Sequence, residues 1–409
     1  MNIQLTSADE KKLRYQEISS SFDKLMKALF RQHGAHLDIN ILSSNEAMDF
    51  IQEHTDILDS SFEKVEMTDK MRERLTRSNY IFSGMKTFHE LNEAFPSLLD
   101  ENGDRKPFER FLNDVRKINE TYNRNYLRAE YGFVQSSATM AAKWERFAED
   151  GDEYYLQYRT AHDDKVRPEH AALDRVTLPM SDPFWESYYP PNGWNCRCTV
   201  VQVLKWKYDA TPHGEAMDRG KEALDGERFN IFRFNSGMQG KAVPDYNPYT
   251  IKKCNSCSIA KDDNAKLAFI PDNTLCAACR IVRTCQKEDS KQTKKAAKAL
   301  QGSAIHNPDF PHRVLISKTG IKEWVNQPFK YVKEKNRALL DISNVFRSSV
   351  YLGTADNHKG VPRLVQSHIF ETDIKNEKAY IIVREYDSGE YYLYSLSEGG
   401  KLLEHIKRK

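Results

Sequence analysis

The sequence predicts a multidomain α+β protein, and three observations lead to that fold class. Over residues 1–150, apolar side chains recur at three- and four-residue steps, the period of amphipathic helices. Proline, glycine, tryptophan and tyrosine then become dense between residues 166 and 194, as in a compact unit rich in loops. Beyond residue 303, short runs of β-branched and aromatic residues predict a small α+β domain with an antiparallel sheet.

Three helices are expected in the helical N-terminal region, residues 1–150. The first carries an apolar stripe made of Ile18, Phe22, Leu25 and Leu29. The second covers residues 71–91 and is expected to be interrupted near Gly84, because glycine inside a helix costs about 1 kcal/mol relative to alanine. The third runs over residues 107–147, and Pro107 in its first turn loses no hydrogen bond. We interpret these stripes as core.

Composition divides the rest of the chain into four parts. Residues 151–205 form the compact, loop-rich core, and residues 206–285 an irregular segment that holds five of the seven cysteines. Residues 286–302 are expected to be a basic linker or an exposed helix at a domain boundary, since residues 280–298 contain seven Lys or Arg against two Asp or Glu. Residues 303–409 are the α+β domain. Its basic character favours a polyanionic partner, although a solvated surface is the simpler interpretation.

The last part shows a helix followed by four strands. Residues 331–346 fit one helix, and strands are expected at residues 349–352, 366–374, 379–386 and 390–396. The tripeptide at residues 387–389, Asp-Ser-Gly, is typical of a hairpin turn between the last two strands.

The seven cysteines predict metal binding rather than a disulfide framework. Six of them form closely spaced pairs, and the N-terminus lacks the apolar core of a secretory signal. No apolar run approaches the roughly 20 residues that span a bilayer, so no membrane partner is expected.

The first cysteine group follows two histidines. His162 and His170 precede Cys196 and Cys198, and imidazole with thiolate suits tetrahedral zinc. A tight turn is needed to direct both thiolates at one ion, because residues two apart on a strand lie nearly 7 Å apart. Asp163, Asp164 and Asp174 are alternative ligands or supports of a histidine, and packed turn residues without metal are the other interpretation.

The second group has the spacing of a zinc ribbon. Cys254 and Cys257 are followed after 18 residues by Cys276 and Cys279, with each pair expected in a turn. Four thiolates would hold a structural Zn(II) and leave no position for a reactive water. A redox dithiol is the alternative, and Cys285 is an extra thiol that could replace one ligand.

The stretch from residue 158 to residue 198 resembles the core motif of the phage Mu F-like minor head proteins, a family that includes SPP1-type head-morphogenesis proteins. The matching segments read YRT at 158–160, RPEH at 167–170, PFW at 183–185 and YPPNGWNCRC at 189–198. Residues 82–87 and 126–131 also look like family positions, so the resemblance spans about residues 75–200. It implies a protein of the virion, inside the phage head, that associates with the portal, other head proteins and packaged DNA.

The C-terminal domain is similar, more faintly, to nuclease domains with the fold of barnase, EndoU, RNA-cleaving colicins and RelE. This resemblance implies a metal-independent endoribonuclease that acts on RNA in the bacterial host cytoplasm. The preferred catalytic pair is His368 with Arg384, which would share a face of the sheet if the register allowed. His312 is a further proton-transfer group, and Tyr394 and Ser395 would position the phosphate. The alternatives are structural histidines, and a domain that only binds DNA, portal or scaffold.

Overall fold

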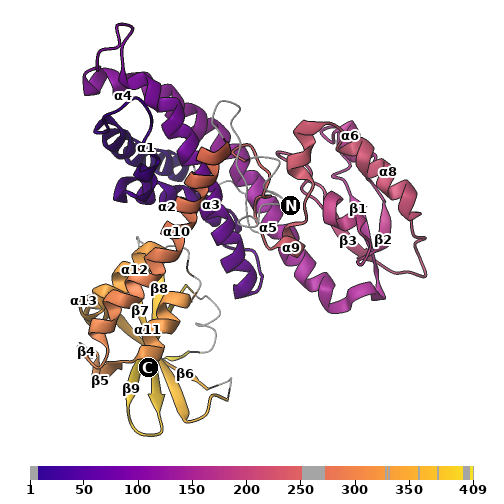
Figure 1. Cartoon of the computed structure of the whole chain (residues 1–409). Coiled ribbons are helices and arrows are strands. Elements are labelled where there is room, and N and C mark those ends of the chain that lie inside the picture. Colours follow the sequence, from indigo (N-terminus) through magenta and orange to yellow (C-terminus); the bar gives the residue numbers. More distant parts are fainter. Residues whose placement is uncertain are drawn as a thin grey trace. The chain divides into compact units, whose positions relative to one another are not determined.

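The computed structural model describes residues 8–250, 272–327, 329, 332–357, 360–374, 377–398 and 406–408 (Figure 1). The chain divides into two compact units, Met1–Arg283 and Thr284–Lys409. This boundary falls inside a single helix, α10 (Asp272–Ala297). The segment expected to be irregular up to residue 285 is helical from residue 272 onward, and these turns are packed in the first unit. The basic stretch that follows continues the same helix as far as Ala297, which is one of the two alternatives expected for it.

The N-terminal part of the first unit is a bundle of long helices. They are α1 (Ala8–Phe30), α2 (Asn45–Asp59), α3 (Asp69–Ala94), α4 (Phe108–Glu120) and α5 (Leu127–Asp150). Ser44 and Thr68 start α2 and α3 by accepting hydrogen bonds from the backbone amides of Ala47 and Met71. The predicted stripe of α1 is buried in the common core, as are Phe50, Phe88 and Phe111.

Helix α3 continues through Gly84 without interruption, contrary to the expectation from sequence. The reason is close packing: a Cβ atom at Gly84 would lie 2.4 Å from Cγ1 of Val282 on α10. Glycine at this position therefore permits close approach of two helices. Glycine inside a helix is less favourable than alanine, and the close contact with α10 is the reason that glycine is needed at this position.

Helices α4 and α5 are joined by a π-helical stretch, Thr121–Tyr126, so the predicted third helix is helical throughout. The carbonyl of Tyr122 in this stretch accepts a hydrogen bond from the buried Lys86 Nζ at 2.7 Å. Lys86 Nζ also donates to Glu130 Oε2 at 2.5 Å, and Glu130 Oε1 accepts from the Tyr249 hydroxyl at 2.6 Å. The bundle core thus contains a buried ion pair that links α3, α5 and a later segment of the chain.

A second buried acid, Glu90, lies on the same face of α3. Its Oε2 accepts a hydrogen bond from Asn123 Nδ2 at 2.8 Å. Burial raises the pKa of the Glu90 carboxyl to about 8, although Lys86 and Asn123 act in the opposite direction. Glu90 is therefore mostly protonated at neutral pH, and Glu130 is the partner of the Lys86 ammonium.

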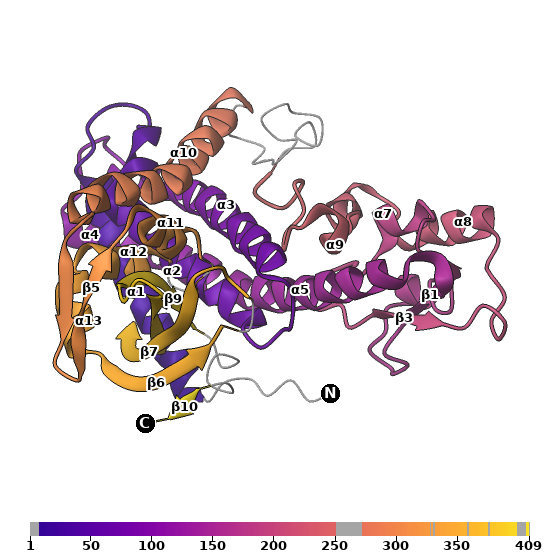
Figure 2. The same ribbon diagram turned by 90° about the horizontal axis from the view of Figure 1, so that it is seen from below.

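The rest of the first unit is built on a three-stranded antiparallel sheet in the order β2-β1-β3. The strands are β1 (Tyr155–Arg159), β2 (Thr177–Pro179) and β3 (Thr199–Val203). Short helices α6 (Pro168–Ala171) and α7 (Phe184–Tyr188) lie in the connections, and α8 (His213–Ala223) follows in the segment expected to be irregular. Figure 2 shows α5 running from the bundle to these strands, and Trp144 and Phe147 of α5 pack in their core with Trp185.

The second unit is a mixed sheet of seven described strands in the order β10-β6-β7-β8-β9-β5-β4. The predicted strands are confirmed as β6 (Val350–Asp356), β7 (Leu364–Ile374), β8 (Glu377–Tyr386) and β9 (Tyr391–Ser397), which pair antiparallel in that order. The hairpin turn is also present, with Gly389 at φ +76°. Three further strands extend this sheet: β4 (Ala304–Asn307), β5 (Phe310–Ile316) and β10 (Lys407–Arg408).

Two features of the second unit differ from the expectation. Strand β5 pairs with β9 in parallel, so the sheet is not purely antiparallel. The single helix expected at residues 331–346 is two helices, α12 (Val332–Leu340) and α13 (Ile342–Ser348), separated at Asp341, whose backbone leaves the helical region. With α11 (Lys318–Asn326) they cover one face of the sheet, where Trp324, Leu339 and Phe346 share a core with Phe370 and Val383.

Candidate functional site

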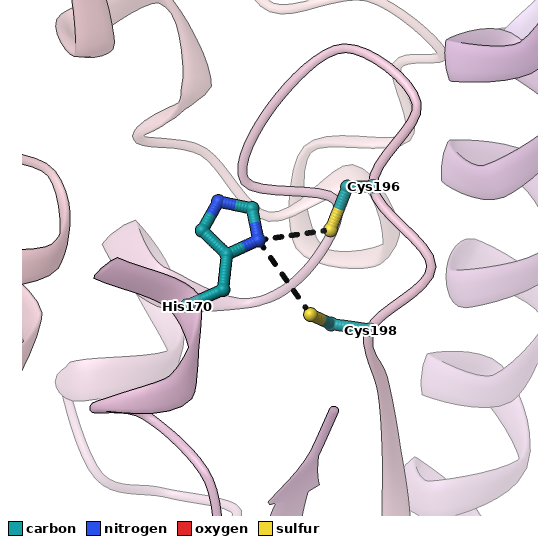
Figure 3. A group of neighbouring side chains, drawn as sticks. All are labelled: His170, Cys196 and Cys198. Atoms are coloured by element: carbon teal, nitrogen blue, oxygen red, sulfur yellow. Dashed lines mark hydrogen bonds between the residues drawn. The ribbon is translucent and has the colours of Figure 1, made fainter. Parts of the chain in front are cut away.

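Among the described residues, one group has the composition of a metal site: His170, Cys196 and Cys198 (Figure 3). His170 lies on α6, whose first residue, Pro168, is suited to a helix start. Cys196 and Cys198 come directly before β3, and the amide of Cys196 donates to the carbonyl of Gly193 in a turn. The left-handed backbone of Asn195, with φ +57°, completes that turn.

The distances in this group fit a tetrahedral ion. His170 Nδ1 lies 3.7 Å from Cys196 Sγ and 3.6 Å from Cys198 Sγ, and all three ligand atoms lie within 4.8 Å of one another. Typical Zn–N and Zn–S bonds around a tetrahedron place nitrogen and sulfur about 3.6 Å apart. The residues present therefore fit Zn(II), with two thiolates and one imidazole.

The local electrostatics favour a thiolate. Hydrogen bonds from the Cys198 thiol and from His170 hold the pKa of the Cys196 thiol well below its usual value, although burial opposes them. The pKa of the Cys198 thiol is raised instead, because Cys196 is the neighbouring anion and the site is buried. A bound dication would favour the thiolate form of both cysteines, since a coordinating thiol is deprotonated.

Four other predicted ligands or supports of this centre are engaged elsewhere or lie apart. His162 is half-exposed, and its Nε2 lies 3.3 Å from Asp174 Oδ1. The same Asp174 oxygen accepts from the Thr160 amide at 2.9 Å. Asp163 is held by Arg197, whose NH2 donates to Asp163 Oδ1 at 2.7 Å. The structure therefore brings together three of the four ligands expected here and does not add His162, and Asp164 is likewise not part of the group.

The second cysteine group is only half described. Cys254 and Cys257 lie outside the described residues. Cys276 and Cys279 lie on helix α10 rather than in a ribbon turn, so that local expectation is wrong. Cys279 is buried in the core of the first unit, and its sulfur accepts a hydrogen bond from Arg283 Nε at 3.4 Å. The apolar neighbours of Cys279 on α10, including Leu275 and Val282, explain why a helix forms here.

A second candidate site lies on the sheet of the second unit, around His368. This histidine is buried, its Nε2 lies 2.8 Å from Glu385 Oε2, and its Nδ1 lies 3.0 Å from the Tyr351 hydroxyl. Burial lowers the pKa of the His368 imidazole, with Glu385 opposing that effect. The exposed His312 stacks on Tyr391 with ring centroids 4.3 Å apart, and the ring of His368 lies 5.5 Å from the same tyrosine.

The strand register places His368 and Arg384 on opposite faces of the sheet. Arg384 pairs with Ser367, whereas His368 pairs with Val383. Successive side chains along a strand point to opposite faces, so the register does not allow the expected shared face. Arg384 instead stacks on Tyr394, with Cζ 3.3 Å from the ring centroid, and Ser395 is buried opposite Ile382.

Sequence reasoning missed Glu385 and Tyr351, the two groups that contact His368. In the sequence, the signal for Glu385 was its position next to Arg384. The face of the sheet that Glu385 shares with His368 follows only from the strand register. The choice of Arg384 over Glu385 was therefore a choice between adjacent residues of one strand, which local pattern does not resolve.

Comparison with known proteins bears on the first unit. Residues 102–201 match the family model described as Phage Mu protein F like protein. This region is therefore Mu F-like. It contains the whole of α4 and α5, the three-stranded sheet except its last two residues, and all three residues of the metal group.

Two curated relatives match parts of the chain. Capsid assembly protein F of Escherichia phage Mu is 33% identical over 168 residues, which are 37% of this chain and 36% of that protein. The Mu-like prophage FluMu F protein of Haemophilus influenzae is 32% identical over 108 residues, 26% of this chain and 23% of the relative. The matches thus span about a third or less of these relatives. No solved structure matches the chain significantly.

The second unit matches a different family. Residues 285–394 fit the model described as Large polyvalent protein-associated domain 3. This match begins at the boundary between the two compact units, so the Mu F-like region and the C-terminal domain are separate parts both in sequence family and in fold. None of the described helices is long and apolar enough to cross a membrane.

Proposed function

We propose that this chain takes part in phage head assembly and is carried in the virion, inside the head. The observation that carries the proposal is the Mu F-like region, since the phage Mu relative is named as a capsid assembly protein. On the same basis we propose the portal, other head proteins and packaged DNA as partners.

The test is made on the phage or prophage that encodes the chain. Purified heads should contain it by mass spectrometry, and a strain in which its gene is interrupted should give fewer DNA-filled heads by electron microscopy. A complementing copy should restore the yield. Heads that lack the protein, together with an undiminished yield in the interrupted strain, would contradict the proposal.

We propose that His170, Cys196 and Cys198 hold a structural Zn(II). When bound, the ion would link α6, through His170, to the segment before β3, through Cys196 and Cys198. The buried Tyr158 supports that turn, because its hydroxyl donates to Asn192 Oδ1 at 2.9 Å. Elemental analysis of the purified chain should give at least one zinc per molecule, and one fewer in Cys198→Ser. A folded, zinc-free wild-type protein would refute the site.

As a second function, we propose that the C-terminal domain is a metal-independent ribonuclease. The observation that favours it is the pair of histidines on one side of the sheet, a buried His368 held by Glu385 and an exposed His312. In this proposal Glu385, which is held by His368 Nε2, removes the proton of the ribose 2′-hydroxyl, and the exposed His312 protonates the leaving 5′-oxygen. Arg384 has no direct part, because it lies on the other face.

The ribonuclease proposal is tested with the purified full chain and total cellular RNA in the presence of a chelator. Cleavage should fall by about two to four orders of magnitude in His368→Ala or His312→Ala. His306→Ala, at an exposed position of β4, is the matched control and should keep full activity. Absence of cleavage by the wild-type protein, or equal cleavage by all variants, would leave the C-terminal domain a binding module for DNA, portal or scaffold.

A further inference from the structure

The metal group opens on a basic cavity. A cavity of about 220 Å³ is lined by all three ligand residues and by Lys165, Arg167 and Arg197. Of the four other side chains considered as ligands or supports, His162, Asp163 and Asp174 make the contacts given above, and Asp164 is not part of the group. Among the described residues, the group therefore has three ligands, and a four-coordinate ion would have a position left to fill.

The walls of this cavity hold their shape through specific contacts. Arg167 donates from NH2 to the Trp194 carbonyl at 2.5 Å. A Cβ atom at Gly193 would lie 2.7 Å from Arg167 NH1 and 3.6 Å from His170 Cε1, so glycine lets these side chains lie against the turn. Arg167 is thus placed beside the metal-binding imidazole by the backbone that also carries the cysteines.

The charges around the open position favour an anion. A dication with two thiolates and a neutral imidazole carries no net charge, so it exerts little repulsion on a further anionic ligand. Arg197 is already paired with Asp163. Arg167 donates to the neutral Trp194 carbonyl, and Lys165 is exposed on the rim. A ligand that brings one negative charge would meet these two cations.

We propose that the fourth ligand of this metal is a carboxylate from outside the chain, admitted through the basic cavity. This inference rests on the metal site proposed above. Carboxylate oxygen is an established zinc ligand, and a carboxylate has a second oxygen that accepts hydrogen bonds from Arg167 or Lys165. The carboxylate belongs either to a small molecule or to an acidic side chain of a partner protein.

Cobalt(II) gives a readout that does not depend on any activity. The full chain is loaded with Co(II) in a buffer without carboxylates, and acetate is titrated while the visible d–d bands are recorded. A saturable change is expected in the wild type, none is expected in Cys198→Ser, and an excess of Zn(II) should abolish it. Lys165→Met should weaken acetate binding about two- to fivefold, which is the contribution expected of one exposed charge. Lys207→Met, outside the cavity, is the matched control and should leave acetate binding unchanged.

The source of the carboxylate is resolved by a second arm. Purified portal protein of the same phage is added in carboxylate-free buffer. A band change that acetate reverses identifies a partner side chain, and a response to acetate alone identifies a small carboxylate. Both outcomes support the proposal.

Two outcomes overturn it, and they differ. Cobalt bands that depend on Cys198 but respond to neither acetate nor portal would mean that the chain itself or water fills the fourth position. Bands that change in Cys254→Ser or Cys257→Ser would identify a fourth ligand from the chain. Identical bands in the wild type and in Cys198→Ser would remove the metal site, and the inference with it.

Discussion

At the scale of single residues, the buried acids of the helical bundle have different roles. Glu130 accepts from the Lys86 ammonium at 2.5 Å, whereas Glu90 is protonated at neutral pH because burial raises its pKa to about 8. Both side chains are almost fully buried on neighbouring helices, so burial alone does not distinguish them. The hydrogen-bond partner of each acid distinguishes the two, since that partner determines which carboxyl carries a charge.

Replacing these acids by glutamine should separate their roles. Glu130→Gln leaves the Lys86 ammonium buried without a counter-ion and should lower the free energy of unfolding by about 3–5 kcal/mol. Glu90→Gln resembles the protonated acid and removes the cost of protonating Glu90 in the fold, so at pH 7 it should not lower the free energy of unfolding and should raise it. Urea unfolding at pH 7, followed by circular dichroism, measures both. Equal losses in the two variants would contradict the assignment of charge.

The same carboxyl predicts a pH dependence. The pKa of Glu90 is raised in the folded protein, so its protonation favours folding fully below its ordinary pKa of 4.5, and this contribution is lost as pH rises to about 8. The stability advantage of Glu90→Gln over the wild type should therefore grow with pH between about 4.5 and 8 and then level off. Urea titrations at several pH values test this. A difference that is constant across that range would show that Glu90 is already charged in the fold.

At the scale of elements, glycines inside helices differ by what they touch. Gly84 of α3 lies against Val282 of α10, where a Cβ atom would clash at 2.4 Å. Gly132 of α5 has its nearest neighbour at 3.8 Å, which is ordinary contact. A sequence window contains the glycine but not the partner helix, so an interruption of α3 was the natural expectation.

Substituting each glycine by alanine tests this difference. Gly84→Ala should destabilise the protein by about 1–3 kcal/mol, as overpacking in a core does. Gly132→Ala should be neutral or stabilising by up to about 1 kcal/mol, because alanine favours a helix. Val282→Ala should recover much of the loss caused by Gly84→Ala. A double-mutant cycle by chemical denaturation measures the coupling, and independent effects would argue against direct contact.

At the scale of the whole molecule, the two compact units should respond separately to loss of metal. The proposed zinc ligands all belong to the first unit, so chelation should lower the stability of residues 151–205. The loss should reach about 4 kcal/mol if the metal was present at a thousandfold its Kd. Hydrogen exchange should show faster exchange in β1 and β3 and unchanged exchange in β7 and β8. Faster exchange in both units alike would contradict this independence.

Local sequence determined much of this protein. Periodicity predicted α1, α3, α4 and α5 of the first unit and four strands of the second, because side-chain spacing along one element is a property of neighbouring residues. Helix α2 was not predicted. The group His170, Cys196 and Cys198 was also predicted, since few residue types bind zinc and their spacing needed only one turn. The unusual composition of residues 158–198 indicated the Mu F-like region that the family match confirms.

Tertiary structure alone decided the rest. The register between β7 and β8 placed His368 with Glu385 and separated it from Arg384, and a shift of one residue would have reversed this. The same holds for the parallel pairing of β5 with β9, the helix that contains Cys276 and Cys279, and the contact that requires Gly84. Each depends on which distant segment packs alongside. That choice is made by burial across the whole core, and a local pattern does not record it.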